Sequence, residues 1–457
     1  PKYVGTYNAS AGHGGYGAGR IYDANGSDSQ VDVIGSQPYD SPEAPVMPGS
    51  SGTTTAQKST AKLCGGGVVR IVVSGTATVD GIIRADASGS SAANTGLGSG
   101  GSVWLTTHVV RGSGKLTANG GFSSVAAGYW ACGAGGRVAL DYDPEAQDAA
   151  DQEGGVPTLR LQAAAKWTYT SARSRPQADV GSVYMTDDRF LGETFDGTRG
   201  VSDGQVFCGT WSRWQPKSLT VSDVWVRFPE GPATNLTLTG DVRVSGVNGR
   251  LEIGGDEAFP YCYSVNSQVE ETDRASRVRR MSATCPKLAC ANLTLADGGQ
   301  FMIYPGLTNG VDQADGAEIV LSGDFTVGTN SFALLPCHPT NGAVVKVTAE
   351  NVTVEPGAWL SSAGQGFMEY KLPGETTSTG GIAPGYPAYS RPSIYAASHG
   401  GAGSHVSNGL NSLPYDSLEE PRMPGSPGNR GYNKYGGGSG GGVVLIVAHS
   451  KVTVDGT

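Results

Sequence analysis

Histidine near carboxylates is the first combination in this chain that could carry metal chemistry. A histidine, an aspartate and a glutamate occur twice in matching local sequences, as His13, Asp40 and Glu43 and as His399, Asp416 and Glu419. Imidazole nitrogens and carboxylate oxygens are common ligands of divalent ions. The alternative is loop docking, because a duplication repeats residues whatever they do. We favour docking and expect no metal and no cofactor; the docking residues are His13, Tyr39, Asp40, His399, Tyr415 and Asp416.

Three further patterns for binding or catalysis are weaker. The segment SAGHGGYGAG at 10–19 resembles a phosphate-binding loop in glycine content only, since it lacks the GK[ST] ending. Glycosidases need two convergent carboxyl groups, for which the candidates are Asp141, Asp143, Asp187 and Asp188. Adjacent residues on a strand face opposite sides, so Asp187 and Asp188 do not form a catalytic pair by themselves. Six histidines offer no arrangement typical of nucleophilic catalysis, and we expect no enzyme.

Tyrosines and glycosylation sequons suggest contact surfaces. Eleven of the 19 tyrosines cluster in glycine-rich loops, where they could cover the flank of the fold or contact a partner. Five N-x-Ser/Thr sequons fit a eukaryotic secretory route, at Asn8, Asn25, Asn235, Asn292 and Asn351. Seven cysteines at irregular spacings predict three disulfides and one free thiol if the protein is secreted.

Glycine dominates the composition. It supplies 71 of 457 residues, roughly twice the average share, while charged residues are only 16%, which excludes a coiled coil or helical bundle. The net charge of −9 argues against a nucleic-acid partner. The longest apolar run, VVLIVA at 443–448, is as short as a strand, so we expect no membrane span in this segment. Because the chain starts at Pro1, we interpret it as a processed or excerpted piece.

A long repeat organises the chain. The sequences HGG, PYDS, MPGS, GGGVV and VDG occur first between 13 and 81 and again between 399 and 456, at offsets of 375 to 386 residues. The chain therefore holds one unit of about 375 residues and the beginning of a second.

A shorter motif lies inside this unit: an apolar residue, a threonine, and another apolar or small residue. Its threonines are Thr78, Thr117, Thr220, Thr237, Thr294, Thr326, Thr353 and Thr453. Period-two alternation places the threonine on one face of a strand and its neighbours on the other. Asp-Gly, Asn-Gly or Pro-Gly turns and a second short strand usually follow. The threonines that we assign to turns or ladders are Thr78, Thr220, Thr237, Thr294, Thr326, Thr353 and Thr453.

Two architectures fit a strand–turn–strand–turn–strand module. In an antiparallel sandwich each hairpin would pair with itself. In a parallel β-solenoid equivalent strands of successive windings would stack at about 4.8 Å. We favour the solenoid, because the motif returns after 27 and 32 residues between 293 and 354. The fold class expected is all-β, a right-handed parallel β-helix with long Gly/Pro/Tyr-rich loops. One helix is expected, at 268–280, from Glu/Arg and Asp/Arg pairs at i, i+4.

Differences in composition and periodicity divide the chain into four segments. Residues 1–144 hold a Gly-rich loop and the first windings, and 145–216 hold an insertion or irregular windings. Residues 217–366 carry the regular windings, and 367–457 begin the second repeat. Within these segments, 1–64 and 373–438 are expected to be long loops that pack on the flank.

The repeat resembles a known family. The series HGG, PYDSPEAPVMPGSSG and CGGGVVRIVVSGTATVDGIIRADA is similar to the Gly-rich β-helical repeat of very large secreted or cell-surface proteins of protists such as stramenopiles, and of some bacterial autotransporter-type or adhesin-like proteins. The resemblance covers residues 7–120 and 395–457; Cys64 departs from it, standing where the second copy has Ser439. It implies a surface or filament-building component and brings no catalytic residues.

We therefore expect an extracellular structural protein, a rod of tandem repeats that associates with its own copies into a filament, hair or sheath. At about 25 residues per winding, one repeat would make about 15 windings and be roughly 70 Å long. The alternative is a carbohydrate-binding adhesin or a polysaccharide-degrading β-helix enzyme, with glycans as partners.

Overall fold

The computed structural model describes residues 7–9, 11–21, 31–34, 36–52, 63–89, 95–122, 130–165, 178–258, 263–264, 280–307, 315–367, 398–400, 414–427 and 440–457. The chain consists mostly of strands and divides into two compact units. The first unit is Pro1–Phe228, Asn248–Arg250 and Ser267–Arg277, and the second is Pro229–Val247, Leu251–Asn266 and Val278–Thr457.

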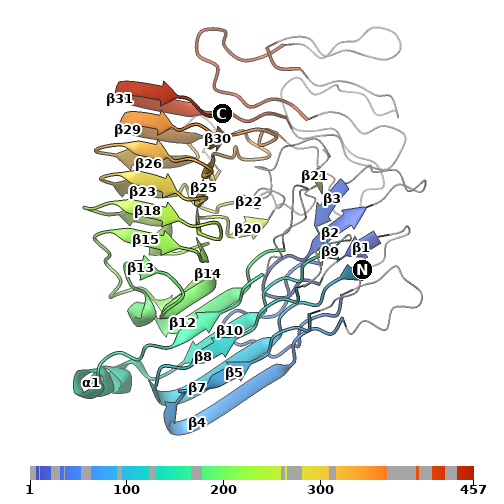
Figure 1. The fold of residues 1–457 in the computed structure, drawn as a ribbon, viewed down its shortest axis with the longest axis vertical. Helices are drawn as coiled ribbons and strands as arrows, with labels where there is room; N and C mark the ends of the chain where they lie inside the picture. Colours follow the sequence, from blue (N-terminus) through green and yellow to red (C-terminus); the bar gives the residue numbers. More distant parts are fainter. Residues whose placement is uncertain are drawn as a thin grey trace. The chain divides into compact units, whose positions relative to one another are not determined.

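Parallel strands build the first unit (Figure 1). They are β4 (Val68–Thr78), β5 (Ile82–Arg84), β7 (Ser102–Arg111), β8 (Lys115–Thr117), β10 (Arg137–Asp141), β11 (Arg160–Gln162), β12 (Ser182–Asp187), β13 (Thr194–Phe195), β14 (Gly200–Thr210), β15 (Leu219–Ser222) and β16 (Trp225–Phe228). One row runs β4–β7–β10–β12–β14, and a second runs β5–β8–β11–β14–β16, every pair being parallel. Strand β13 pairs in parallel with β15.

Smaller elements flank these rows. Strands β1 (Tyr7–Ala9), β2 (Ala18–Ile21) and β3 (Val31–Ile34) form an antiparallel sheet, so the expectation of loops throughout 1–64 was wrong. Strands β6 (Thr95–Gly96) and β9 (Trp130–Ala131) pair in parallel. Short 3₁₀ turns, η1 (Asp188–Phe190) and η2 (Pro232–Thr234), lie in the first and second unit respectively.

A helix that the sequence analysis missed lies between β10 and β11. This helix, α1 (Pro144–Gly154), begins after Asp143, whose carboxylate accepts the N–H groups of Glu145 and Ala146. An aspartate cap followed by proline at the first position is a strong helix start. The helix expected at 268–280 lies outside the described residues, except for its last residue, Arg280, which is in a strand.

The second unit repeats a three-strand module. Its strands are β17 (Asn235–Thr237), β18 (Val242–Ser245), β19 (Arg250–Ile253, at the border of the two units), β23 (Lys287–Cys290), β24 (Leu293–Ala296), β25 (Gln300–Ile303), β26 (Ala317–Leu321), β27 (Phe325–Val327), β28 (Phe332–Leu334), β29 (Val345–Val354), β30 (Trp359–Ser361) and β31 (Leu445–Val454). Parallel rows run β17–β23–β26–β29, β18–β24–β27–β29–β31 and β25–β28–β30 (Figure 1). Outside the rows are β20 (Glu257–Ala258), β21 (Tyr263–Ser264) and β22 (Arg280–Met281).

The strands of a module are joined by the predicted tight turns. Between β24 and β25, Asp297 and Gly298 both have positive φ, of 55° and 91°. Between β29 and β30, Gly357 has a φ of 73°. Aspartate tolerates this left-handed region better than most residues, and glycine adopts it without a steric penalty.

Threonine and aliphatic ladders run across the modules of the second unit. Thr294, Thr326, Thr353 and Thr453 occupy one register on four successive strands, in half-buried positions. Beside them Leu293, Phe325 and Val352 are in register and fully buried. This is the division between faces that the alternation predicts.

Three of the predicted ladder threonines lie elsewhere. Thr237 is opposite Ala289 and belongs to the β17–β23 row, while Thr78 is opposite Arg111. Thr220 is opposite Thr194, a pairing within the first unit. The motif repeats in all of these strands, but the modules have different lengths, which places the threonines in different rows.

The described cysteines form no disulfide. The predicted set of three disulfides does not form among the described cysteines, which are Cys64, Cys132, Cys208, Cys285, Cys290 and Cys337; Cys262 lies outside the described residues. Within the described parts of the chain, no helix is long and apolar enough to cross a membrane.

Candidate functional site: a duplicated His–Tyr–Asp loop

The residues predicted to dock a loop do come together. In the first copy, the rings of His13 and Tyr39 have centroids 4.6 Å apart, and the Tyr39 N–H donates to the His13 carbonyl at 2.9 Å. His13 Nε2 lies 3.6 Å from Asp40 Oδ2. We call residues 11–17 and 36–52 the first loop. The segments 11–17 and 36–52 are thus joined through the neighbouring side chains of His13, Tyr39 and Asp40.

The carboxylate of Asp40 organises the backbone of this loop. Its Oδ1 accepts the N–H of Ser41 at 2.9 Å, and its Oδ2 accepts those of Val46 and Met47 at 2.8 Å. Asp40 itself has a φ of 70°, a conformation that aspartate tolerates better than most residues. A short carboxylate that accepts nearby backbone N–H groups is typical of a closed turn.

The hydroxyl of Tyr39 closes the other end of the loop. It donates to the Pro48 carbonyl at 2.6 Å and lies 2.9 Å from Ser50 Oγ. The aromatic ring therefore spans the loop: it packs against His13 at its base, with the ring planes tilted by 32°, and its hydroxyl is hydrogen-bonded at the tip. This explains why tyrosine and the MPGS sequence recur together.

The second copy has the same internal geometry. We call residues 398–400 and 414–427 the second loop. His399 and Tyr415 have centroids 4.9 Å apart, and the Tyr415 N–H donates to the His399 carbonyl at 2.8 Å. Tyr415 Oη donates to the Pro424 carbonyl at 2.6 Å, and Asp416, with a φ of 77°, accepts the N–H of Met423 at 2.8 Å. The local sequence specifies this loop in both contexts.

Electrostatics support the carboxylate's role in the second loop. His399 Nε2 lies 3.3 Å from Asp416 Oδ2. Burial alone would raise the pKa of Asp416, but hydrogen bonds from the Met423 and Ser417 N–H groups and from His399 outweigh it and lower the pKa. The ionised carboxylate is therefore the form that the loop binds.

A column of polar residues holds the first loop against the parallel strands. Arg137 donates through Nε and Nη2 to the Tyr39 carbonyl at 2.9 and 2.7 Å, and through Nη1 to Ser182 Oγ at 2.9 Å. Ser102 Oγ donates to the Met47 carbonyl at 2.6 Å. Ser102, Arg137 and Ser182 are in register on β7, β10 and β12. Burial lowers the pKa of Arg137 to about 10, so its guanidinium remains charged at neutral pH.

The sequence analysis missed Arg137, although a signal was present. The column residues follow glycines at the start of each strand, in GGSV at 100–103, GGRV at 135–138 and VGSV at 180–183. The arginine stands among serines at this position, and it makes two hydrogen bonds to the Tyr39 carbonyl of the loop, where Ser102 makes one to that of Met47.

His13 is locked in one tautomer. Its Nδ1 lies 2.8 Å from the carbonyl oxygen of Gly100, which can only accept, so Nδ1 carries the proton. Burial lowers the pKa of His13, and the Arg137 charge acts in the same direction, against the Gly100 hydrogen bond and Asp40. His13 is therefore buried and neutral, and its Nδ1 donates a hydrogen bond to the backbone carbonyl of Gly100.

Glycines let the first loop touch the strand backbone. A Cβ at Gly14 would lie 1.9 Å from the Gly136 carbonyl oxygen, closer than any side chain can approach. The Gly14 N–H donates to the Gly135 carbonyl at 3.0 Å, and the Gly49 N–H donates to that of Gly66 at 2.9 Å. The HGG sequence is thus needed for close contact.

These contacts are those of a docking loop. Asp40 and Asp416 accept backbone N–H groups. Glu43 and Glu419 are exposed. The described residues contain no group of three or more His, Cys, Asp or Glu side chains arranged to hold a metal.

The carboxylates considered for catalysis also have structural partners. Asp141 accepts Trp104 Nε1–H at 2.5 Å, and Asp143 caps α1. Asp187 bonds Arg189 and Tyr142, and although burial raises the pKa of Asp187, these hydrogen bonds lower it overall. Asp188 accepts the N–H groups of residues 212–214.

Two of the five sequon asparagines belong to a polar ladder. Asn292 Nδ2 donates to Asp241 Oδ1 at 2.8 Å, and Asn351 Nδ2 donates to Asp324 Oδ1 at 2.7 Å. The Asp324 N–H donates to Asn292 Oδ1 at 2.8 Å, which links the two pairs. Asn235 is exposed on β17. The side chain of Asn8 and all of Asn25 lie outside the described residues.

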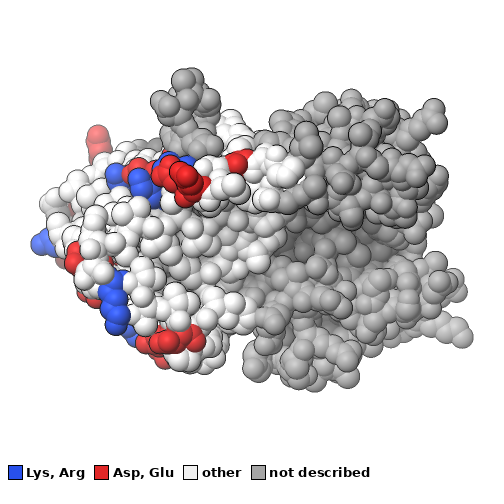
Figure 2. Space-filling view, turned by 90° about the horizontal axis from the view of Figure 1, so that it is seen from above, with Lys and Arg blue, Asp and Glu red and all other residues white. Residues whose placement is uncertain are grey.

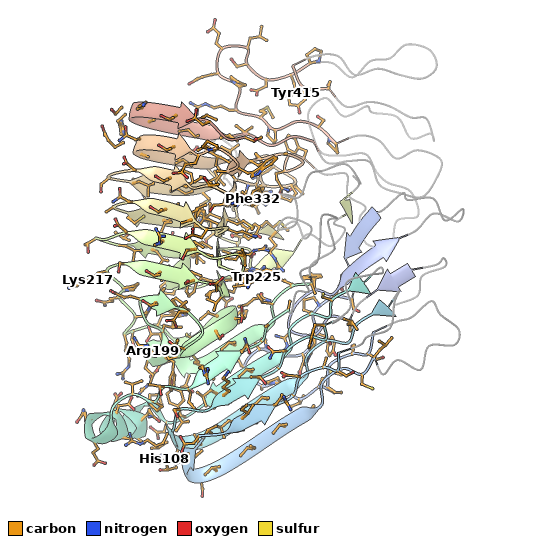
Figure 3. The ribbon with its side chains drawn as sticks, in the orientation of Figure 1. His108, Arg199, Lys217, Trp225, Phe332 and Tyr415 are labelled. Carbon is orange, nitrogen blue, oxygen red and sulfur yellow. The ribbon has the colours of Figure 1, made fainter. Side chains whose placement is uncertain are left out.

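The two loops differ in what surrounds them. The second loop keeps the anchor at its tip, where the Gly425 N–H donates to the Gly441 carbonyl at 2.7 Å as that of Gly49 does to Gly66. Tyr415 lies on the loop drawn above β31 in Figure 3. In the described part of the chain, the second loop has no counterpart of the Arg137 contact.

In comparisons with known proteins, no family model, no curated protein and no solved structure matches the chain.

Proposed function

We propose that this chain is part of an extracellular or cell-surface rod, in which tandem copies of the 375-residue repeat continue one right-handed parallel β-helix. One observation carries the proposal. Strand β31, which opens the second copy of the repeat, pairs in parallel with β29 of the first copy over eight residue pairs. Its counterpart in the first copy is β4, which pairs in parallel with β7. The beginning of one repeat therefore fits on the end of another.

The winding is supported by connectivity. Each module returns the chain to the same row one strand further on, and every such pair is parallel. Parallel strands need a crossover, and crossovers in proteins are right-handed in the great majority of cases. A solenoid of this kind pairs strand edges internally and stiffens with each added module.

The number of modules sets the length of the rod. The described strands make five modules in the first unit and four in the second before β31 begins the next copy. If all nine belong to one stack, a repeat adds roughly 43 Å at about 4.8 Å per strand. This replaces the sequence-based figure of roughly 70 Å, because long segments such as α1 and the loops lengthen the modules.

A two-repeat chain tests the proposal. We would join residues 83–457 directly after Thr457, since Thr457 corresponds to Ile82 in the repeat. Electron microscopy should show particles longer than the single-repeat chain by roughly 43 Å, with unchanged width. The matched control joins two complete chains through a flexible Gly/Ser linker, which breaks the register.

The linker control should give two separate particles with a variable angle between them. If the direct fusion also gave two separate bodies, or a wider particle of unchanged length, the repeats would not continue one stack and the rod proposal would fail.

A further inference from the structure

The first loop shows what the second loop is built to bind. Beyond its own internal bonds, the first loop contacts the segment 95–141. This segment provides the Gly100 carbonyl for His13 Nδ1, the Gly135 carbonyl for the Gly14 N–H, and the Arg137 guanidinium for the Tyr39 carbonyl. These contacts bury the His13 side chain completely.

The matching groups of the second loop are less buried than those of the first. The His399 side chain is 37% exposed, against 0% for His13. A Cβ at Gly400 would meet no atom within 4 Å, whereas at its counterpart Gly14 it would collide with the sheet. Because both loops have the same internal geometry, the second loop is preformed for a contact that the described residues do not supply.

Strand β31 also exposes apolar side chains to solvent. Val452 and Val454 continue the buried column of Val352 and Val354, yet they are 52% and 58% exposed. Their counterparts in the first copy are Ala77, in β4, and Val79, which directly follows β4; they are only 9% and 7% exposed, and Ala77 is opposite Val110 of β7. A strand like β7 would therefore cover the end of the apolar column.

Both observations point to one occupant. We propose that the second loop and β31 form a docking surface for a second copy of residues 95–141, which supplies a β7-like strand to Val452 and Val454 and an Arg137-like guanidinium to the Tyr415 carbonyl. The inference rests on the proposed rod and names the segment that makes its joint. Figure 2 looks down on the region of β31, where the described surface is mostly uncharged, with charged side chains near its rim. An uncharged, glycine-rich surface suits close backbone contact.

Residues Gly14 and Gly400 offer a matched test. In the single-repeat chain, Gly14→Ala should loosen the first loop, and Gly400→Ala should change nothing. In the two-repeat chain defined above, Gly400→Ala should become as disruptive as Gly14→Ala, because its Cβ would meet the second copy of Gly136. Gly75→Ala, where a Cβ also meets no atom, is the control in both chains.

Hydrogen exchange of residues 398–400 and 414–427 gives the readout. The two-repeat chain should protect their amides at least about tenfold more than the single-repeat chain, and Gly400→Ala should remove that gain.

The outcomes separate this inference from the proposed rod. If the two-repeat chain lengthens but the second loop exchanges as before and Gly400→Ala is silent, the docking surface is refuted and the rod remains. If loop protection rises without lengthening, the docking surface remains and the rod is refuted.

Discussion

Single polar side chains fix the loops in this protein. Asp40 and Asp416 each close a turn by accepting backbone N–H groups, and the tyrosine before each of them spans the same loop. Arg137 and His13 then bind the first loop to the strands through carbonyl oxygens alone. Recognition between backbones requires few charged residues, which fits a chain with only 16% of them.

Replacing Arg137 by methionine should destabilise the first loop. The change removes the donor of the buried Tyr39 carbonyl, and an unsatisfied buried group with a lost charged hydrogen bond costs about 2–3 kcal/mol. Urea unfolding would measure the loss. Arg84→Met is the control, because Arg84 is mostly exposed and only loosely paired with Asp86, so the free energy of unfolding should change by less than about 0.5 kcal/mol. Equal effects of the two changes would contradict the docking role.

Acidification should release the first loop through His13. The pKa of His13 is lowered in the folded chain, so the folded state binds fewer protons than the unfolded state once the pH falls below 6.5, the ordinary pKa of histidine. As far as His13 contributes, the free energy of unfolding is therefore highest above pH 6.5. Below pH 6.5 it falls by at most about 1.4 kcal/mol per pH unit, until the pH reaches the pKa of His13 in the folded chain.

Hydrogen exchange of residues 11–17 and 36–52 between pH 7.5 and 5 would measure this decline, after correction for intrinsic exchange. His13→Gln should flatten the profile. A profile that keeps its slope in the variant would show that another group titrates.

At the scale of elements, regular strands carry alternating ladders across the modules. The amide–carboxylate ladder of Asp241, Asn292, Asp324 and Asn351 ties adjacent strands on the half-exposed side. The buried side is aliphatic and aromatic, as at Leu293, Phe325 and Val352. In each module, polar side chains thus lie on the half-exposed side and apolar side chains on the buried side.

Asn351→Asp should break this ladder at neutral pH. It places a second carboxylate beside Asp324, and like charges in register on adjacent strands should cost about 1 kcal/mol. The penalty should shrink at about 1 M salt, which screens exposed charges. Asn235→Asp, at an exposed position, is the control, and urea midpoints at low and high salt make the comparison. A penalty that persists at high salt would exclude charge repulsion as its cause.

The parts of this fold that could be predicted from sequence are the local ones. Alternation around Thr294, Thr326 and Thr353 predicted their shared row, and the duplicated PYDS sequence predicted the loops. Thr78 and Thr237 were misplaced because register depends on the length of each module. Helix α1 was missed although Asp143 and Pro144 are helix-start signals, since the segment was read as irregular.

Sequence alone did not link Arg137 to its partner Tyr39, because the two lie 98 residues apart; the local signal is only that Arg137, like Ser102 and Ser182, follows a glycine at the start of a strand. The antiparallel strands β1 to β3 carry too little alternation to stand out among glycines.

At the scale of the whole molecule, each compact unit is a set of parallel rows, and the chain restarts its own sequence at the end of the second unit. A repeat whose beginning fits on its end can extend without a new kind of interface. Among the described cysteines no disulfide forms, so strand pairing and burial hold the described part of this architecture together.

The central claim is that the second copy continues the stack of the first in register. Thr353 and Thr453 are direct partners across β29 and β31, so Thr353→Cys with Thr453→Cys should be joined efficiently by a short thiol-bridging reagent such as dibromobimane. Thr353→Cys with Lys451→Cys, displaced by two residues, should react poorly, and the parent chain corrects for the native thiols. Efficient bridging of the first pair alone is the result predicted; equal bridging of both pairs, or none, would contradict the stacked register.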